Sequence, residues 1–212
     1  MAKRIFLALL VLTLAAGGAF AQVSIGIGGD FAVSWDSITT TNGGSTYEML
    51  YTRSGGGFYA FFDATYVEVD VGMLFGSQKY KYSWSSGSLE YDQGTRSYLT
   101  LGLFGKYPID LGGFTLFPML GIQYDLGLSA KDTNGKDIEF KDPSMADTLN
   151  RLWIKLGVGA DINLGDSIYL RPSLLYGINF GTKVNNDTVK AGTNTTGLYH
   201  GLDIRAALGF RF

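Results

Sequence analysis

The stretch that decides the fold is the last one of the chain, residues 198–212, which read LYHGLDIRAALGFRF. From Leu198 to Phe212, every second residue is apolar except His200, and the residues between them are small or charged except Tyr199. A period of two places successive side chains on opposite faces of an extended strand. The segment therefore predicts a strand with one apolar face and one polar face.

The same alternation recurs upstream and predicts seven further strands. It covers residues 23–33, 58–64, 67–75, 99–106, 114–126, 151–162 and 168–180. Short connections fall near residues 63–65, 110–113 and 163–166, and long polar ones near residues 36–54, 78–95, 129–149 and 181–196. Strands joined alternately by short turns and long loops are typical of membrane barrels. We therefore expect an all-β fold, an eight-stranded antiparallel up-and-down transmembrane β-barrel.

The composition agrees with this fold and excludes several others. The chain has 212 residues, of which 30 are Gly and 14% are aromatic. Gly destabilises helices, which disfavours a helical bundle. The absence of Cys excludes disulfide scaffolds and zinc–thiolate sites. A net charge of −2 argues against nucleic acid as a partner.

The first residues have the features of a secretory signal peptide. Lys3 and Arg4 precede the apolar run 5–16, and Ala19-Phe20-Ala21 is a cleavage site of small residues on either side of a larger one. The apolar run is shorter than the roughly 20 residues that a spanning helix needs. We expect residues 1–21 to be a cleaved signal peptide and residues 22–212 to form the barrel domain.

Alternation alone does not say which face points inward, because a secreted lipocalin-like barrel has an apolar interior. Gly is frequent on the polar face, and the crowded interior of an eight-stranded barrel needs small side chains. Aromatic residues gather at the two ends of the apolar face: Tyr107, Phe114, Phe210 and Phe212 at one end, and Trp35, Phe58, Phe75, Tyr176 and Phe180 at the other. Such girdles mark the two interfaces of a membrane barrel. The sequence therefore favours the membrane form.

Charges of both signs on the polar face predict an ion-paired interior, because buried charges need partners. The acids are Asp30, Asp63, Glu68, Asp70, Asp125, Asp161 and Asp203, and the bases are Arg96, Lys106, Arg151, Lys155, Arg171, Arg205 and Arg211. Their heights along the strands suggest four pairs: Asp161 with Arg171, Asp125 with Lys155, Glu68 or Asp70 with Lys106, and Asp30 with Arg205.

Two prolines interrupt the predicted strands. Pro118 and Pro172 each lie four residues into a strand and lack the N–H that a ladder uses. A closed barrel has no free edge where this loss is harmless, so we expect a β-bulge at each proline.

These features resemble the small eight-stranded outer-membrane proteins, namely the OmpX and OmpW types and the barrel domain of OmpA. The most specific feature is the C-terminus, where the alternating strand ends on Leu208, Phe210 and Phe212. The resemblance implies recognition of this strand by the barrel-assembly machinery. It also implies export to the outer membrane of a diderm bacterium, where the barrel contacts the membrane lipids.

The sequence predicts no catalytic, cofactor or metal site. A resemblance to lipid A deacylases would imply an outward His with a Ser two residues further along the strand, but His200 is followed there by Leu202. In the segment Lys131–Asp137, Lys136 stands where a calcium loop needs an oxygen ligand. We therefore expect no enzyme and no cofactor.

Three functions remain open, in decreasing order of support. The first is a structural or surface-interaction role, in which four long extracellular loops present a site for an extracellular ligand. The second is a narrow porin-like or OmpW-like conduit for small or apolar molecules, and the third is an enzyme that acts on lipid. The six aromatic residues in or near the first two loops suit contacts, or else continue the strands as hairpins: Tyr47, Tyr51, Tyr80, Tyr82, Trp84 and Tyr91.

Overall fold

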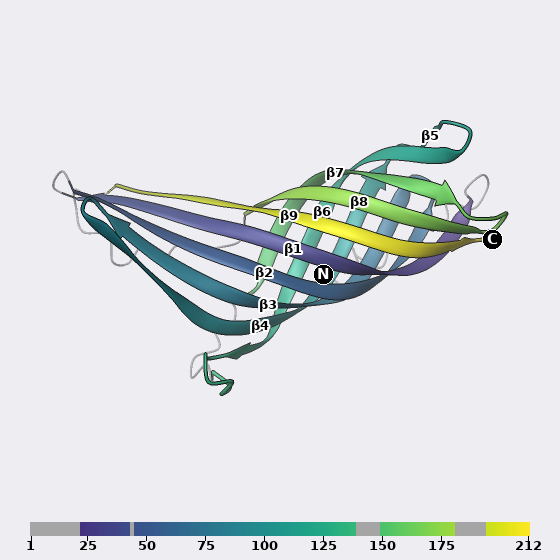
Figure 1. The fold of residues 1–212 in the computed structure, drawn as a ribbon. Helices are drawn as coiled ribbons and strands as arrows, with labels where there is room; N and C mark the ends of the chain where they lie inside the picture. Colours follow the sequence, from purple (N-terminus) through teal and green to yellow (C-terminus); the bar gives the residue numbers. More distant parts are fainter. Residues whose placement is uncertain (1–21, 43–44, 139–148, 181–193) are drawn as a thin grey trace, which may run out of the picture.

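The computed structural model describes residues 22–42, 45–138, 149–180 and 194–212, and these residues form a β-barrel (Figure 1). The predicted signal peptide lies outside the described residues. The strands are β1 (Val23–Asn42), β2 (Ser45–Ala64), β3 (Val67–Trp84), β4 (Gly87–Lys106), β5 (Ile109–Asp110), β6 (Phe114–Lys131), β7 (Arg151–Asn163), β8 (Ile168–Asn179) and β9 (Asn194–Arg211). The all-β fold class is confirmed.

Eight of these strands close into one antiparallel ring. Each strand pairs with the next along the chain, β4 pairs with β6, and β9 pairs with β1 to complete the circle. The two-residue strand β5 pairs only with the start of β6, where it prolongs the hairpin below β4. The predicted eight-stranded up-and-down barrel is therefore confirmed.

The polar faces of the strands point into the barrel and the apolar faces point outward, as a membrane barrel requires. In β9, Asp203 and Arg205 are buried inside the barrel, whereas Ile204 and Leu208 between and beyond them are each 54% exposed on the outside. All but one of the predicted girdle residues are exposed at the rims: Tyr107, Phe114, Phe210 and Phe212 at the short-turn end, and Phe58, Phe75, Tyr176 and Phe180 at the other, whereas Trp35 is half-buried. An apolar outer surface cannot face water over such an area. This excludes the soluble alternative.

The expected bulges at the prolines do not form. Pro118 stays in register opposite Val158, and its carbonyl oxygen accepts a hydrogen bond from the Tyr107 N–H. The β7–β8 ladder skips the residues opposite Pro172 without a change of register, so no residue is inserted. The ladder loses single bonds at these sites, which costs less than a shift of every following side chain.

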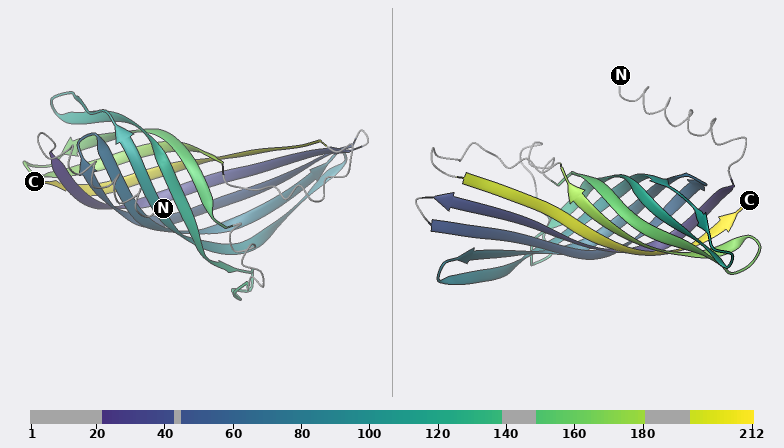
Figure 2. Two further views of the ribbon diagram at one scale, coloured as in Figure 1. Left: turned by 180° about the vertical axis from the view of Figure 1, so that it is seen from behind. Right: turned by 90° about the horizontal axis from the view of Figure 1, so that it is seen from above.

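Two of the expected long loops are strands. The sequence predicts loops at residues 36–54 and 78–95, but β1 continues to Asn42 and β2 begins at Ser45, while β3 and β4 run to a turn at residues 85–86. β8 ends at Asn179, so β9 above His200 has no partner on that side among the described residues. The barrel wall is therefore much taller on one side, as Figures 1 and 2 show.

We call this taller part the strand extension. It consists of residues 36–42 of β1, 45–54 of β2, 77–84 of β3, 87–94 of β4 and 194–199 of β9. A β-bulge between Ser77 and Lys79 marks its base, and Gly94 there has a φ of 87°, which a side chain would strain. The other two predicted long loops contain residues 139–148 and 181–193, which lie outside the described residues.

Within the described part of the chain, no helix is long and apolar enough to cross a membrane.

Candidate functional site

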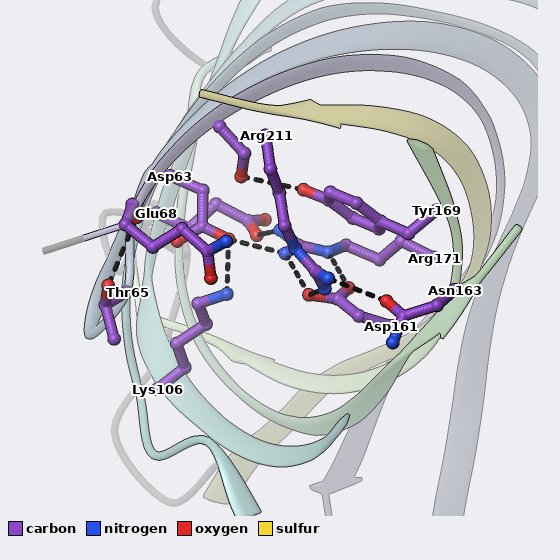
Figure 3. Close-up of polar contacts among 11 residues, drawn as sticks. Asp63, Thr65, Glu68, Lys106, Asp161, Asn163, Tyr169, Arg171 and Arg211 are labelled. Atoms are coloured by element: carbon purple, nitrogen blue, oxygen red, sulfur yellow. Dashed lines mark hydrogen bonds and ion pairs between the residues drawn. The ribbon is translucent and has the colours of Figure 1, made fainter. Parts of the chain in front are cut away.

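The interior at the short-turn end is organised around Arg171 of β8 (Figure 3). Its Nε donates to Asp161 at 2.6 Å, and its two Nη atoms reach Glu68 and Asp63 at 2.5 Å each. The Lys106 ammonium group also pairs with Asp63. Strands on opposite sides of the ring are therefore joined through one guanidinium group.

Aromatic rings fill the space around this ion cluster. The Arg171 guanidinium carbon lies 4.5 Å from the Phe61 ring centre and 5.0 Å from those of Phe117 and Tyr169. Phe104 and Tyr169 have no exposed surface. An eight-stranded barrel is just wide enough for its inward side chains. The short-turn half of the barrel is therefore packed like a protein core.

A second ion cluster lies at mid-height, where β1 meets β9. Arg205 donates to Asp70 at 2.7 Å and to Asp30 at 3.1 Å, and Asp30 is its direct partner in the β1–β9 register. Lys155 pairs with Asp203. These charges come from four strands, so they connect β1 and β9, where the ring closes, to β3 and β7.

The structure brings together two of the four suggested pairs. It joins Asp161 to Arg171 and Asp30 to Arg205. Asp161 and Arg171 lie on neighbouring strands beside one short turn, which fixes their heights. Asp30 and Arg205 are opposed in the register that closes the ring.

The other two suggested pairs do not form. Lys106 reaches Asp63, while Glu68 belongs to the Arg171 cluster and Asp70 to the Arg205 cluster. Lys155 turns to Asp203 of β9, on the far side of the neighbouring strand β8. Asp125 instead accepts hydrogen bonds from Trp153 Nε1 and Gln123 Nε2, both at 2.7 Å. The tilt and stagger of the strands bring together residues that lie at different distances from the short turns along their own strands. The alternation of polar and apolar residues contains no information on this stagger.

A third cluster, at the mouth of the barrel, has an excess of arginine. Asp36 accepts from Arg53 at 2.5 Å and from Arg151 at 2.8 Å. Arg96 Nη1 donates only to the backbone carbonyls of residues 93, 95 and 131. No carboxylate among the described residues lies within ion-pair distance of Arg96. Here two arginines share Asp36, and the third, Arg96, has no ion-pair partner among the described residues.

A cavity of about 40 Å³ lies below these arginines. Its lining includes Arg53, Arg96, Arg151, Tyr98 and Trp153. Such a volume holds one or two water molecules or a small ion group. The mouth therefore offers polar space that the packed half below it does not.

The inner side of the strand extension is aromatic. Along β2 and β3, side chains two residues apart share a face, and the inner face continues from Arg53 and Gln78, which are hydrogen-bonded to each other. We call the aromatic side chains on this side the tyrosine face, which consists of Tyr47, Tyr51, Tyr80, Tyr82, Trp84, Tyr91 and Tyr199.

The rings of the tyrosine face contact one another across strands. Ring centres of Tyr80 lie 4.8 Å from Tyr51 and 5.0 Å from Tyr91. Further from the barrel, Tyr82 lies 6.0 Å from Tyr47 and 5.7 Å from Trp84. These spacings are those of favourable aromatic pairs. The contacts define two groups of rings, Tyr51, Tyr80 and Tyr91 nearer the mouth arginines and Tyr47, Tyr82 and Trp84 further from the barrel.

The outer side of the strand extension is polar. Lys79 and Glu90 approach to 4.0 Å there, and the Ser37 hydroxyl donates to Glu48 at 3.2 Å. In the barrel body the polarity is opposite, with apolar side chains outside. This inversion indicates that the strand extension stands in water above the membrane.

Sequence reasoning missed Asp36, Arg53 and the single-sided placement of the tyrosines. The segment 36–54 is rich in Ser, Thr and Gly and therefore resembles a loop. The signal that could have found them is residues 79–84, which read KYKYSW and keep a period of two with the polarity reversed. The hairpin interpretation of the six aromatic residues is the correct one.

The structure gives His200 no catalytic partner among its described neighbours. Its ring lies 5.3 Å from that of Trp35, and its Nδ1 is 3.4 Å from the Tyr176 hydroxyl. The residue two positions on is Leu202. These contacts are typical of a girdle at a membrane interface.

The segment suggested as a calcium loop closes on itself. Asp132 Oδ1 accepts hydrogen bonds from the N–H groups of Asn134 and Lys136, both at 2.9 Å. This is a local Asx turn. Across the described residues, no group of three or more His, Asp or Glu side chains could hold a metal ion.

The C-terminal residues Leu208, Phe210 and Phe212 all face outward. They are 54%, 44% and 72% exposed, respectively. The rings of Phe210 and Phe212 pack edge to face at 5.1 Å. An apolar strip is therefore presented on the outer surface of β9 at the short-turn end.

Comparison with known proteins shows the fold of this chain. No family model and no curated protein matches it. The chain is similar to the outer membrane protein OprG from Pseudomonas aeruginosa, with a TM-score of 0.52 and 14% identity over 92% of this chain and 98% of that one.

Two further solved structures are less similar. One is Neisserial surface protein A, with a TM-score of 0.41 and 11% identity over 87% of this chain and 97% of that one. The other is the N-terminal β-barrel domain of OprF from Pseudomonas aeruginosa, with a TM-score of 0.36 and 11% identity over 85% and 97%. The fold is that of an outer-membrane β-barrel.

Proposed function

We propose that this protein is a surface-interaction protein without an active site, in which the barrel is a closed anchor that presents the strand extension outside the cell. The observation that supports this best is the contrast between the two parts. The barrel body is filled by ion pairs and rings, whereas the tyrosine face is partly exposed and has no partner among the described residues. Tyrosine, tryptophan and arginine are the residues that dominate contact energies at interfaces.

The orientation and assembly of the anchor follow general rules for membrane barrels. Short turns face the periplasm and long hairpins face the outside. Residues 1–21 serve as the cleaved export signal, and residues 22–212 form the barrel domain. The outward strip of Leu208, Phe210 and Phe212 serves as the assembly signal for the barrel-assembly machinery.

The alternative function is a narrow conduit for small or apolar molecules. The cavity at the mouth favours it, because it provides the first part of a path. The Arg171 cluster and its rings oppose it, because they occupy the cross-section below. The closed anchor is therefore the better supported function.

Surface presentation can be tested by labelling a single cysteine in intact cells, because the chain has no Cys of its own. Thr41→Cys places a thiol near the tip of the strand extension, and Asp166→Cys places one in a short turn. We expect a membrane-impermeant maleimide to label the Thr41→Cys variant in intact cells and the Asp166→Cys variant only after the outer membrane is opened. The reverse pattern would contradict the proposal.

A further inference from the structure

The mouth of the barrel is the one described layer of the interior with more cations than carboxylates. In the Arg171 layer, the cations Arg171, Lys106 and Arg211 face the acids Asp63, Glu68 and Asp161. At the mouth, Arg53 and Arg151 share Asp36, Asp125 lies opposite Arg151 in the β6–β7 register, and Arg96 has only backbone partners among the described residues, so three cations face two carboxylates. The Arg96 Nε is buried without a hydrogen-bond partner. Arg96 as a whole is half-buried, and a cation partly removed from water without an anion is destabilised by that loss.

The missing negative charge can come from outside, because the arginines lie at the open end. Guanidinium groups bind carboxylate, sulfate and phosphate through paired, charge-assisted hydrogen bonds. Arg53 and Arg96 line the same cavity, whose lining carries four cations (Arg53, Arg96, Arg151 and Lys155) and three carboxylates (Asp30, Asp125 and Asp203) and therefore has a net positive charge. The mouth is therefore suited to an anionic group of a ligand.

The tyrosine face adds a second binding element directly beside these arginines. Tyr51 is two residues from Arg53 on the same face of β2, and Tyr80 contacts Tyr51. Burial raises the pKa of both tyrosines, so their hydroxyls stay neutral and can donate or accept hydrogen bonds. Rings with hydroxyl groups suit a ligand whose own faces are apolar and whose edges are polar.

The row of rings is longer than one small molecule. Successive inner residues of a strand are about 7 Å apart, and the rings on β3 continue from Tyr80 through Tyr82 to Trp84. A ligand that uses the row must therefore repeat ring units along its length. Sugar rings have this property, because the C–H groups on a pyranose face pack on aromatic rings and its hydroxyls point to the edges.

Resting on the proposed surface function, we propose that the tyrosine face and the mouth arginines form a binding site for an acidic saccharide. The sugar rings stack on the row of tyrosines. A carboxylate, sulfate or phosphate of the saccharide is bound at Arg96 and Arg53. An apolar solute would leave these arginines uncompensated, and a free inorganic anion would leave the rings unused.

The test uses the refolded full chain in detergent micelles and titration calorimetry. The probe is a tetramer of galacturonic acid, and the neutral comparison is maltotetraose. We expect the acidic tetramer to bind and the neutral one to bind at least about tenfold more weakly, since charge-assisted hydrogen bonds supply much of the affinity. Binding should weaken as salt is raised, because the site is open to solvent.

Matched variants locate the site on the inner side of the strand extension. Arg96→Gln should weaken binding of the acidic tetramer about tenfold, and Tyr80→Leu about fivefold. Lys79→Gln removes a cation from the same strand on its outer side and should leave binding unchanged. All variants must show the same heat-modifiable migration as the parent, which establishes that they are folded.

Several outcomes would overturn the assignment. They are no binding of the acidic tetramer, equal loss in the Lys79→Gln variant, equal affinity for maltotetraose, or equal affinity for free sulfate. Equally tight binding of a polyglutamate peptide would also overturn it, in favour of an acidic polypeptide. If Thr41→Cys is labelled on intact cells but no saccharide binds, the surface function stands and this inference fails. If that thiol is shielded, the surface function itself fails.

Discussion

At the scale of single residues, Arg171 is the side chain on which the closed interior depends most. It is 2% exposed, it contacts three carboxylates, and it lies among three aromatic rings. Removal of one partner from a buried ion group leaves the others uncompensated, and that loss exceeds what the group itself contributes. We therefore expect replacement of Arg171 to lower the free energy of unfolding by more than the intact ion cluster adds to it.

We expect Arg171→Met to destabilise the barrel by about 3–5 kcal/mol, because Glu68 loses its ion-pair partner inside the packed half of the barrel and Asp161 keeps only Arg211, at 3.4 Å. Urea unfolding of the refolded protein, followed by gel mobility, measures this. The comparison is Lys79→Met, which breaks an exposed pair with Glu90 and should cost about 0–1 kcal/mol. Similar losses in the two variants would show that the interior ion cluster does not stabilise the fold.

The charge pairs show which contacts between single residues can be predicted from the sequence. Burial of the charged residues follows from the period of two, since every second side chain must point inward. The Asp161–Arg171 pair also follows, because a short turn fixes the two heights. The Lys155–Asp203 pair does not follow, because it joins two strands that are not neighbours and depends on their stagger, which the sequence of a single strand does not contain.

At the scale of elements, β2 depends on glycine where it approaches β3 most closely. A Cβ added at Gly57 would overlap the Met73 carbonyl oxygen, and one added at Gly55 would overlap that of Phe75. The neighbouring Gly56 points the other way, and its nearest atom would be the Asp30 carbonyl oxygen at 3.7 Å. Only alternate glycines of this run are therefore required.

We expect Gly57→Ala to destabilise the barrel by about 1–3 kcal/mol, because backbone must move to admit the methyl group. Gly56→Ala should change stability by less than about 1 kcal/mol, since its space is ordinary. Unfolding in urea under identical conditions compares these adjacent variants. A larger loss for Gly56→Ala would show that the β2–β3 register differs from the one described.

The strand extension should be separable from the barrel, because its pairs lie above the closed ring. Lys79 and Asp92 are directly opposed, so an Asn-Gly turn can replace residues 80–91 between them. We expect this shortened chain to refold into a heat-modifiable barrel and to lose binding of the acidic tetramer, because Tyr80, Tyr82, Trp84 and Tyr91 are removed. Failure to refold would show instead that the hairpin is part of the folding unit.

The same elements explain why the long hairpins are harder to recognise from the sequence than the strands of the barrel body. Inside the membrane, an apolar outer face makes the alternation easy to see. Above the membrane, the outer face carries Lys, Ser and Thr, and the inner face carries Tyr. The side chains still alternate with a period of two, but the polar residues now lie on the outer face and the aromatic residues on the inner one. Composition then resembles that of a loop. The strand continues because backbone pairing does not depend on which face is apolar.

At the scale of the whole molecule, the layers of the interior decide between an anchor and a conduit. An ion entering from the mouth reaches the cavity beside Arg53, then the Arg205 cluster, and then the Arg171 cluster with Phe104 and Phe117. Each lower layer is held by ion pairs from strands on several sides. A water path would have to separate these pairs and also displace the rings, and both changes are unfavourable.

We therefore expect the purified, refolded barrel to show no steady conductance in a planar lipid bilayer. Heat-modifiable migration of the same sample shows that the protein is folded. An absence of conductance then indicates that the interior is closed. The charge-exchanged variant Asp161→Arg with Arg171→Asp is measured beside it, because it alters the layer that any through-path must cross. Steady conductance of the parent that changes in this variant would identify a path through the barrel. The narrow conduit would then replace the closed anchor as the function of the barrel body, and the arginine-rich mouth would become its entrance.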